Sequence, residues 1–167
     1  MLSPATDADL TDAAALINVS YRGQAAEAGW THENGYISGE RITAAELAEM
    51  RAGRPDGRLL LHRSGAGALV ACVWLEPHCD GAWYLGLLAV RPDRQDRKLG
   101  GAVLEEAETL ARRQGGHRMR LTVVHIRETL IAWYQRRGYR LTDETEPFPQ
   151  PALALRDLHL VVLEKAL

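Results

Sequence analysis

The chain has 167 residues, of which 46% are hydrophobic and 25% charged, enough for one globular domain with a buried core. Its 20 basic and 22 acidic residues give a net charge of −2, which argues against a nucleic-acid-binding protein and a basic membrane anchor. No apolar stretch is long enough for a membrane helix, residues 1–12 lack the pattern of a secretory signal, and two cysteines are too few for a disulfide scaffold. We therefore expect one cytoplasmic domain over residues 1–167, with no nucleic-acid or membrane partner.

Two helices are predicted near the N-terminus. Thr6 and Asp9 form a capping-box pattern before a helix that extends to Tyr21, and Thr43 and Glu46 form a second one before a helix that ends at Gly53. The polar segment between the helices, residues 22–42, is long for a connection, so we expect it to carry function.

Three strands are predicted next, because short apolar runs alternate with turn signals. They cover residues 58–62, 68–76 and 83–90, separated by a glycine-rich turn and by the segment from Pro77 to Gly81. Consecutive strands joined by short turns indicate an antiparallel meander.

The second half of the chain alternates helical and extended patterns. We expect helices at 100–114 and 128–137, and strands at 119–124, 139–142 and 158–164, with a proline-rich loop at 144–157. This order predicts a mixed α/β domain.

A basic, glycine-containing loop follows the third predicted strand. The strand ends at Val90, Pro92 interrupts it, and Gly100 opens a helix after the cations Arg94, Arg97 and Lys98. Helix N-termini bind phosphate through free N–H groups, so the loop is a candidate phosphate site, although an ordinary strand–helix turn with solvated arginines fits equally well. It matches neither the P-loop nor the dinucleotide-binding glycine pattern.

The same loop resembles the acetyl-CoA motif of the GNAT superfamily of N-acetyltransferases. It reads Val90-x-Pro92-x-x-Gln95-x-x-Lys98-Leu99-Gly100, where the family has Val-x-Pro, Gln or Arg, two residues, then Gly-x-Gly or Gly-x-Ala. Lys98 stands where the first Gly of that pattern is expected. A later block is similar too, since Tyr134 lies four residues before the pair Gly138-Tyr139.

This resemblance implies one mixed α/β domain with a mostly antiparallel twisted sheet, a splayed parallel strand pair (83–90 and 119–124) and about four flanking helices. It implies acetyl-CoA as cosubstrate and no metal. The residues it places against acetyl-CoA are Leu88, Ala89, Val90, Gln95, Asp96, Arg97, Lys98, Leu99, Gly100, Gly101, Arg127 and Tyr134. A backbone N–H near Leu88 would stabilise charge on the thioester oxygen. Arg127 stands where the family often has Asn.

The implied reaction is transfer of an acetyl group to a primary amine, with a small molecule as the leading acceptor. The alternatives are a peptide or protein amine, and a CoA-binding module without catalysis. Tyr134 is the expected acid for the departing thiolate. An alkylammonium must lose a proton at a cost of about 4.6 kcal/mol at neutral pH, so a base is expected. Many relatives have a Glu where this chain has Tyr84, so the candidate bases lie elsewhere, at Glu76, Glu33, His32 and His125.

The acceptor side is expected between residues 22–42 and 144–157. The side chains predicted to contact the acceptor are Trp30, His32, Glu33, Arg41, Tyr84 and Phe148. Acidic groups there suit a cationic acceptor and Arg41 suits a carboxylate, so the sequence leaves the acceptor charge open. Cys72, His78 and Cys79 lack zinc-site spacing, which predicts no metal. A homodimer is possible if the final strand, 158–164, forms a sheet edge.

Overall fold

The computed structural model describes the backbone of residues 1–167 and every side chain except those of Asp96 and Arg97. The strands are β1 (Leu2–Pro4), β2 (Arg58–Arg63), β3 (Leu69–Pro77), β4 (Ala82–Val90), β5 (Arg118–Val124), β6 (Arg140–Pro147) and β7 (His159–Ala166). They form one sheet in the order β1-β2-β3-β4-β5-β7-β6. Every neighbouring pair is antiparallel except β4 and β5, which are parallel, so the predicted sheet is confirmed.

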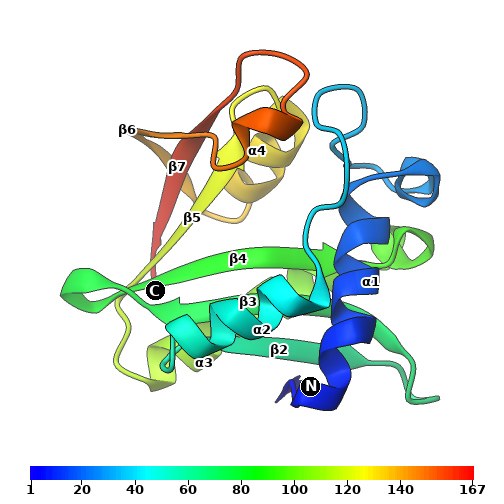
Figure 1. Ribbon diagram of the computed structural model, residues 1–167. Helices are drawn as coiled ribbons and strands as arrows, with labels where there is room; N and C mark the ends of the chain where they lie inside the picture. The colour runs from blue at the N-terminus through cyan, green and yellow to red at the C-terminus, as the bar shows by residue number, and fades with distance from the viewer.

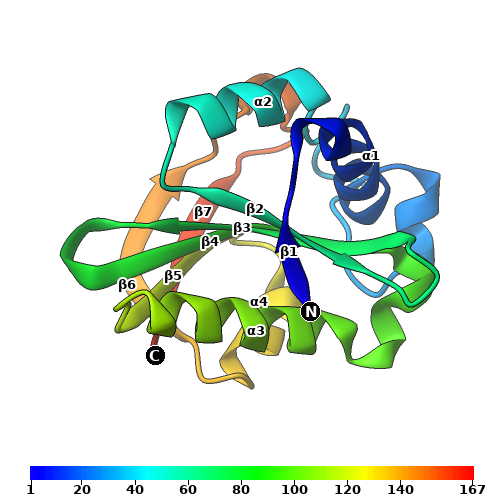
Figure 2. The same cartoon turned by 90° about the horizontal axis from the view of Figure 1, so that it is seen from below.

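Four α-helices cover the sheet, as expected. They are α1 (Leu10–Tyr21), α2 (Ala44–Gly53), α3 (Leu99–Arg113) and α4 (Glu128–Gln135). Figure 2 shows α1 and α2 on one face and α3 and α4 on the other. Each face has its own apolar core, because Trp74 packs with the α1–α2 side whereas Val73, the residue before it, packs with the α3–α4 side.

The parallel pair is joined only at its beginning. Ala82 to Tyr84 of β4 pair with Arg118 to Arg120 of β5, and beyond these residues the two strands separate into the V seen in Figure 1. A strand edge without a neighbour presents backbone N–H and C=O groups. The separation therefore gives a ligand access to the backbone in the middle of the sheet.

A bulge interrupts β4 beside this gap. The register between β3 and β4 shifts between Cys72 and Trp74, and Leu87 takes a left-handed conformation with φ of +48°. Such a conformation is unusual for a residue other than glycine. The bulge changes the direction of β4 just before Leu88, where the strand reaches the candidate site.

Three expectations were wrong. The chain begins with a strand, β1, that the sequence pattern did not predict. The strand expected at 139–142 continues as β6 to Pro147, inside the predicted loop. The final strand is not a sheet edge: β7 lies between β5 and β6, so a second copy cannot pair with it, and the edges are β1 and β6.

None of the helices in the described structure is both long and apolar enough to cross a membrane.

Candidate active site

The first of two adjoining cavities follows the loop after β4. Its wall contains the predicted donor residues Leu88, Ala89, Val90, Gln95, Lys98, Gly100, Gly101, Arg127 and Tyr134, together with Trp30. The side chain of Gln95 fixes this loop, because its amide donates to the Val90 carbonyl (3.1 Å) and accepts from the Trp30 backbone N–H (3.0 Å). The predicted donor loop and the beginning of the 22–42 segment are thus in contact.

Lys98 has the backbone conformation that glycine would adopt readily. Its φ of +59° lies in the left-handed region, immediately before α3. The departure from the family motif therefore preserves the turn at a conformational cost of about 1–2 kcal/mol. The first turn of α3 carries no acidic residue, so its free N–H groups and Lys98 together suit a phosphate.

The second cavity fills the gap between β4 and β5 and has a volume of about 140 Å³. Four of the predicted acceptor residues line it: Glu33, Arg41, Tyr84 and Phe148. The Tyr84 hydroxyl lies 3.3 Å from the Thr122 hydroxyl, which bridges the two separating strands. At this position the GNAT pattern often has a Glu that could act as a base. Tyr84 instead provides a contact across the gap between β4 and β5.

Tyr134 stands where the two cavities meet, because it lines both together with Tyr21, Leu88, Leu130 and Arg127. Its ring is buried and edge-on to Trp133 and Tyr139. Burial raises the pKa of Tyr134 above its ordinary value, so the hydroxyl keeps its proton at neutral pH. The group can donate a hydrogen bond to an atom placed between the cavities.

Tyr21 closes the same wall from α1. Its hydroxyl donates to the Leu88 carbonyl (3.2 Å), and burial raises the pKa of Tyr21 to about 12. Ser20, the residue before it, donates to the Val90 carbonyl at 3.0 Å. The end of α1 therefore holds the part of β4 that follows the bulge.

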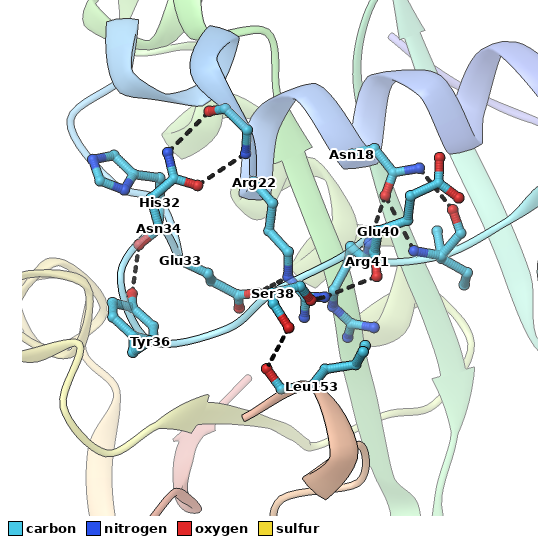
Figure 3. Close-up of polar contacts among 12 residues, drawn as sticks. Asn18, Arg22, His32, Glu33, Asn34, Tyr36, Ser38, Glu40, Arg41 and Leu153 are labelled. Carbon is cyan, nitrogen blue, oxygen red and sulfur yellow. Dashed lines mark hydrogen bonds and ion pairs between the residues drawn. The ribbon is translucent and has the colours of Figure 1, made fainter. Parts of the chain in front are cut away.

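Glu33, a predicted base, is buried between two arginines. Its carboxylate accepts from Arg22 Nε at 2.8 Å and from Arg127 Nη1 at 3.3 Å. Arg22 also donates to the carbonyls of Ser38 (3.2 Å) and Glu40 (2.8 Å), as Figure 3 shows. Both carboxylate oxygens are occupied, so the contacts of Glu33 are those of a residue that fixes the loop.

The two segments predicted to form the acceptor side are joined by backbone hydrogen bonds. The Ser38 N–H donates to the Leu153 carbonyl (2.8 Å), and the Leu155 N–H donates to the Tyr36 carbonyl (2.9 Å). Asn18 of α1 holds the same loop by accepting from the N–H groups of Arg41 (2.7 Å) and Ile42 (3.1 Å). These contacts place Arg41 at the acceptor cavity.

Several predicted residues lie outside the two cavities. Glu76 accepts from Trp74 Nε1 (2.8 Å) and pairs with Arg54 (3.4 Å), away from Tyr134. The His32 ring points away from Glu33 in Figure 3, and the ring of His125 stacks on His159. Leu99 packs against the core because it begins α3. The predictions for Asp96 and Arg97 fall outside the described side chains.

Residues that the sequence analysis did not assign also line the donor cavity, chiefly Tyr21 and Arg137. Tyr21 was predicted only as the end of the first helix, where the structure also places it. The Arg137 guanidinium lies 3.7 Å from the centroid of the Trp133 ring. The only feature of the sequence that pointed to Trp133 and Arg137 is that Trp133 directly precedes Tyr134.

The sequence and the fold are similar to those of known proteins. A family model described as "Acetyltransferase (GNAT) family" matches residues 22–139. No curated protein matches the chain.

Solved structures share the fold at low sequence identity. A ribosomal-protein-alanine N-acetyltransferase from Brucella melitensis is 18% identical, with a TM-score of 0.70 over 100% of this chain and 99% of that one. A GNAT family acetyltransferase from Elizabethkingia anophelis, solved with acetyl-CoA bound, is 17% identical, with a TM-score of 0.63 over 73% and 82%. An IAA acetyltransferase from Bacillus cereus is also 17% identical, with a TM-score of 0.59 over 68% and 79%.

Proposed function

Because the chain belongs to the acetyltransferase (GNAT) family, we propose that it transfers an acetyl group from acetyl-CoA to the primary amine of a small molecule. The observation that carries the proposal is the position of Tyr134 on the wall shared by the two cavities. A donor on one side and an acceptor on the other would meet at its hydroxyl.

The donor cavity has the features that the CoA pyrophosphate requires. Gly100 and Gly101 allow close approach to the start of α3, and Lys98 and Arg137 supply positive charge. Acetyl-CoA supplies the acetyl thioester to this reaction. We assign its binding to the loop from Val90 to Gly101, and the contact with the thioester to the β4 backbone near Leu88.

In the proposed reaction the amine nitrogen forms a bond to the acetyl carbon and the bond from that carbon to sulfur breaks. Tyr134 donates a hydrogen bond to the departing sulfur, which stabilises the developing thiolate. Among the side chains described, the acceptor cavity has one carboxylate, Glu33, and both of its oxygens are occupied. We therefore assign to water the proton that the acceptor ammonium loses before it attacks. The electron pair of the carbon–sulfur bond leaves with the thiolate, which takes up a proton as the nitrogen loses its second one.

The acceptor cavity favours a small molecule over a protein amine. Its volume of about 140 Å³ is close to the roughly 150 Å³ of a cavity that holds one benzene molecule. Phe148 and Pro149 form an apolar part of its wall. A peptide carrying a free N-terminal alanine is the probe for the alternative.

The first test is calorimetric titration with acetyl-CoA. A Cβ at Gly100 would lie 3.6 Å from both Trp133 and Val90, which is ordinary contact, so Gly100→Ala should fold and bind. Gly100→Trp should fill the cavity and abolish binding. Absence of binding by the wild-type protein at millimolar acetyl-CoA would refute the proposal, and equal binding by both variants would refute the assigned loop.

The second test addresses catalysis. Tyr134→Phe should lower kcat for thiol release by at least about tenfold, roughly 1.4 kcal/mol in the barrier, because only the hydroxyl is lost. Acetyl-CoA affinity should stay within about twofold, since the ring remains packed. Thiol release would be followed with a panel of amino acids and alkylamines. Unchanged kcat would remove Tyr134 from the mechanism.

A further inference from the structure

The acceptor cavity has an excess of positive charge. Its charged wall residues are Arg22, Arg41, Arg127 and Glu33, so three guanidiniums face one carboxylate among the side chains described. Arg22 and Glu33 are each about 95% buried at the side chain and neutralise one another. Glu33 also pairs with Arg127, so one carboxylate balances one of three guanidiniums and the wall keeps an excess of two positive charges.

Arg127 has a hydrogen-bond donor that no described group satisfies. Its side chain is 8% exposed, Nη1 donates to Glu33 and Nη2 donates to Thr31 at 2.6 Å, whereas Nε is buried without an acceptor. Buried donors are nearly always paired in folded proteins, so this one, on a cavity wall, is available to an acceptor atom of a water or a ligand in the cavity.

Arg41 is the second cation of this wall, and unlike Arg127 it has no carboxylate partner in the described part of the chain. Its guanidinium makes no ion pair with any carboxylate that the structure describes, and it lies 5.7 Å from the centroid of the Tyr21 ring. Arg127 lies at the same distance from the same ring. Figure 3 shows the Arg41 side chain extending toward Arg22 and Glu33. Two guanidiniums beside one ring give the cavity a concentrated positive wall.

We propose that the acceptor carries a carboxylate beside its amine, as an amino acid does, and that Arg41 and Arg127 bind that carboxylate. The inference rests on the proposed acetyl transfer. A guanidinium presents paired N–H groups that match the two oxygens of a carboxylate. A polyamine would add positive charge to a wall that is already positive, and Glu33 is not free to receive it.

This assignment also separates the leading acceptor class from the alternative. The N-terminal amine of a peptide is followed by an amide, so it offers no carboxylate next to the reacting nitrogen. In a free α-amino acid the carboxylate carbon is two bonds from the amine nitrogen. Both groups therefore enter the same small cavity. The positive wall further disfavours the protonated amine, which must lose its proton to react.

The test compares matched acceptors in the thiol-release assay. Alanine, methionine, phenylalanine and glutamate are each assayed beside the corresponding α-carboxamide, together with spermidine and the alanine peptide. At least one amino acid should have a KM about tenfold or more below that of its amide, because a charge-assisted pair is lost in the amide.

The variant Arg41→Gln should raise KM for that amino acid by about tenfold and change KM for the amide by less than about twofold. The matched control is Arg113→Gln, which removes the same charge from an exposed position at the end of α3, outside both cavities. It should behave as the wild-type protein with both acceptors.

Three results would overturn the inference. One is preference for an amide, spermidine or the peptide over every amino acid. Another is an equal effect of Arg41→Gln on acid and amide. The third is acetyl-CoA binding with no amino acid either acetylated or bound by the acetyl-CoA complex. In all three the protein still binds acetyl-CoA. Failure of the proposed function itself would appear as absence of that binding, or as acetylation of the peptide in preference to every small amine, spermidine and the amides included.

Discussion

At the scale of single residues, the donor loop contains a lysine in a backbone conformation suited to glycine. Lys98 keeps the left-handed turn before α3 and adds a positive charge at the cavity wall. The strain costs about 1–2 kcal/mol, whereas a glycine would lose about 0.5–1 kcal/mol more conformational entropy on folding. The two effects oppose one another, and the strain is the larger.

Lys98→Gly should therefore raise the free energy of unfolding by up to about 1 kcal/mol relative to Lys98→Ala. Both variants lose the charge, but only glycine relieves the backbone. Urea denaturation of the two proteins isolates this difference, and calorimetry should show weaker acetyl-CoA binding by both variants than by the wild-type protein. A glycine variant less stable than the alanine variant would contradict the strain argument.

The grouping of residues at one cavity was predictable where a short motif contained them. The donor loop and Tyr134 were assigned from consecutive residues, and the structure brings most of them to one cavity. Glu33 could not be interpreted this way, because Arg127 is 94 residues distant along the chain. No partner of Glu33 can be recognised from the sequence, whereas in the structure its carboxylate is buried in ion pairs with Arg22 and Arg127.

At the scale of elements, local signals predicted most of the fold. The boxes at Thr6–Asp9 and Thr43–Glu46 form as expected. The missed part of β6 contains Asp143, Glu144 and Glu146, which have low strand propensity. Charged residues are typical of edge strands, and β6 is an edge, so only the sheet order explains this segment. With three residues, β1 is too short for a periodic signal.

The loop that carries Arg41 depends on one side chain of α1. Asn18 accepts from two backbone N–H groups of this loop and donates to the Ile42 carbonyl at 2.7 Å. Asn18→Ala should release Arg41 and raise the acceptor KM severalfold, with acetyl-CoA affinity unchanged. It should also destabilise the fold by about 1–3 kcal/mol, because three hydrogen bonds of partly buried backbone groups are lost.

Asn18→Asp is the conservative variant for this experiment. It keeps the oxygen that accepts from the loop but replaces the N–H donor to the Ile42 carbonyl with a second oxygen, so it should recover only part of the acceptor KM. Steady-state kinetics and calorimetry on the same preparations separate acceptor from donor effects. Weakened acetyl-CoA binding together with an unchanged acceptor KM would show that Asn18 does not position the acceptor loop.

At the scale of the whole molecule, the fold should lose stability as the pH falls. His62 of β2 is partly buried, and burial lowers its pKa below the ordinary value of 6.5. The unfolded chain therefore binds this proton more readily than the folded protein. The contribution of His62 to the free energy of unfolding is fully present above about pH 6.5, and it decreases as the pH falls below that value. His62→Gln should flatten the decrease between about pH 6.5 and 5, measured as the free energy of unfolding in urea.

A second decrease should remain in that variant at lower pH. Hydrogen bonds from Thr6, Thr43 and Arg120 lower the pKa values of Asp9, Glu46 and Glu144, respectively. Their stabilising effect is present above about pH 4.5 and is lost below it, as the carboxylates bind protons. Identical profiles for wild type and His62→Gln down to pH 5 would exclude the histidine.

The contact between residues 36–38 and 153–155 has a consequence for how a product leaves. Strands β4 and β5 are paired at one end and then separate. On the other side, the 22–42 loop and the loop between β6 and β7 are bridged by the pair Ile37–Ala154. The paired strands and the bridged loops thus lie on different sides of the acceptor cavity. We expect a bulky product to leave only after the hydrogen bonds between the loops break. Turnover of bulky acceptors should then depend on solvent viscosity, whereas turnover of small ones should depend on the chemical step.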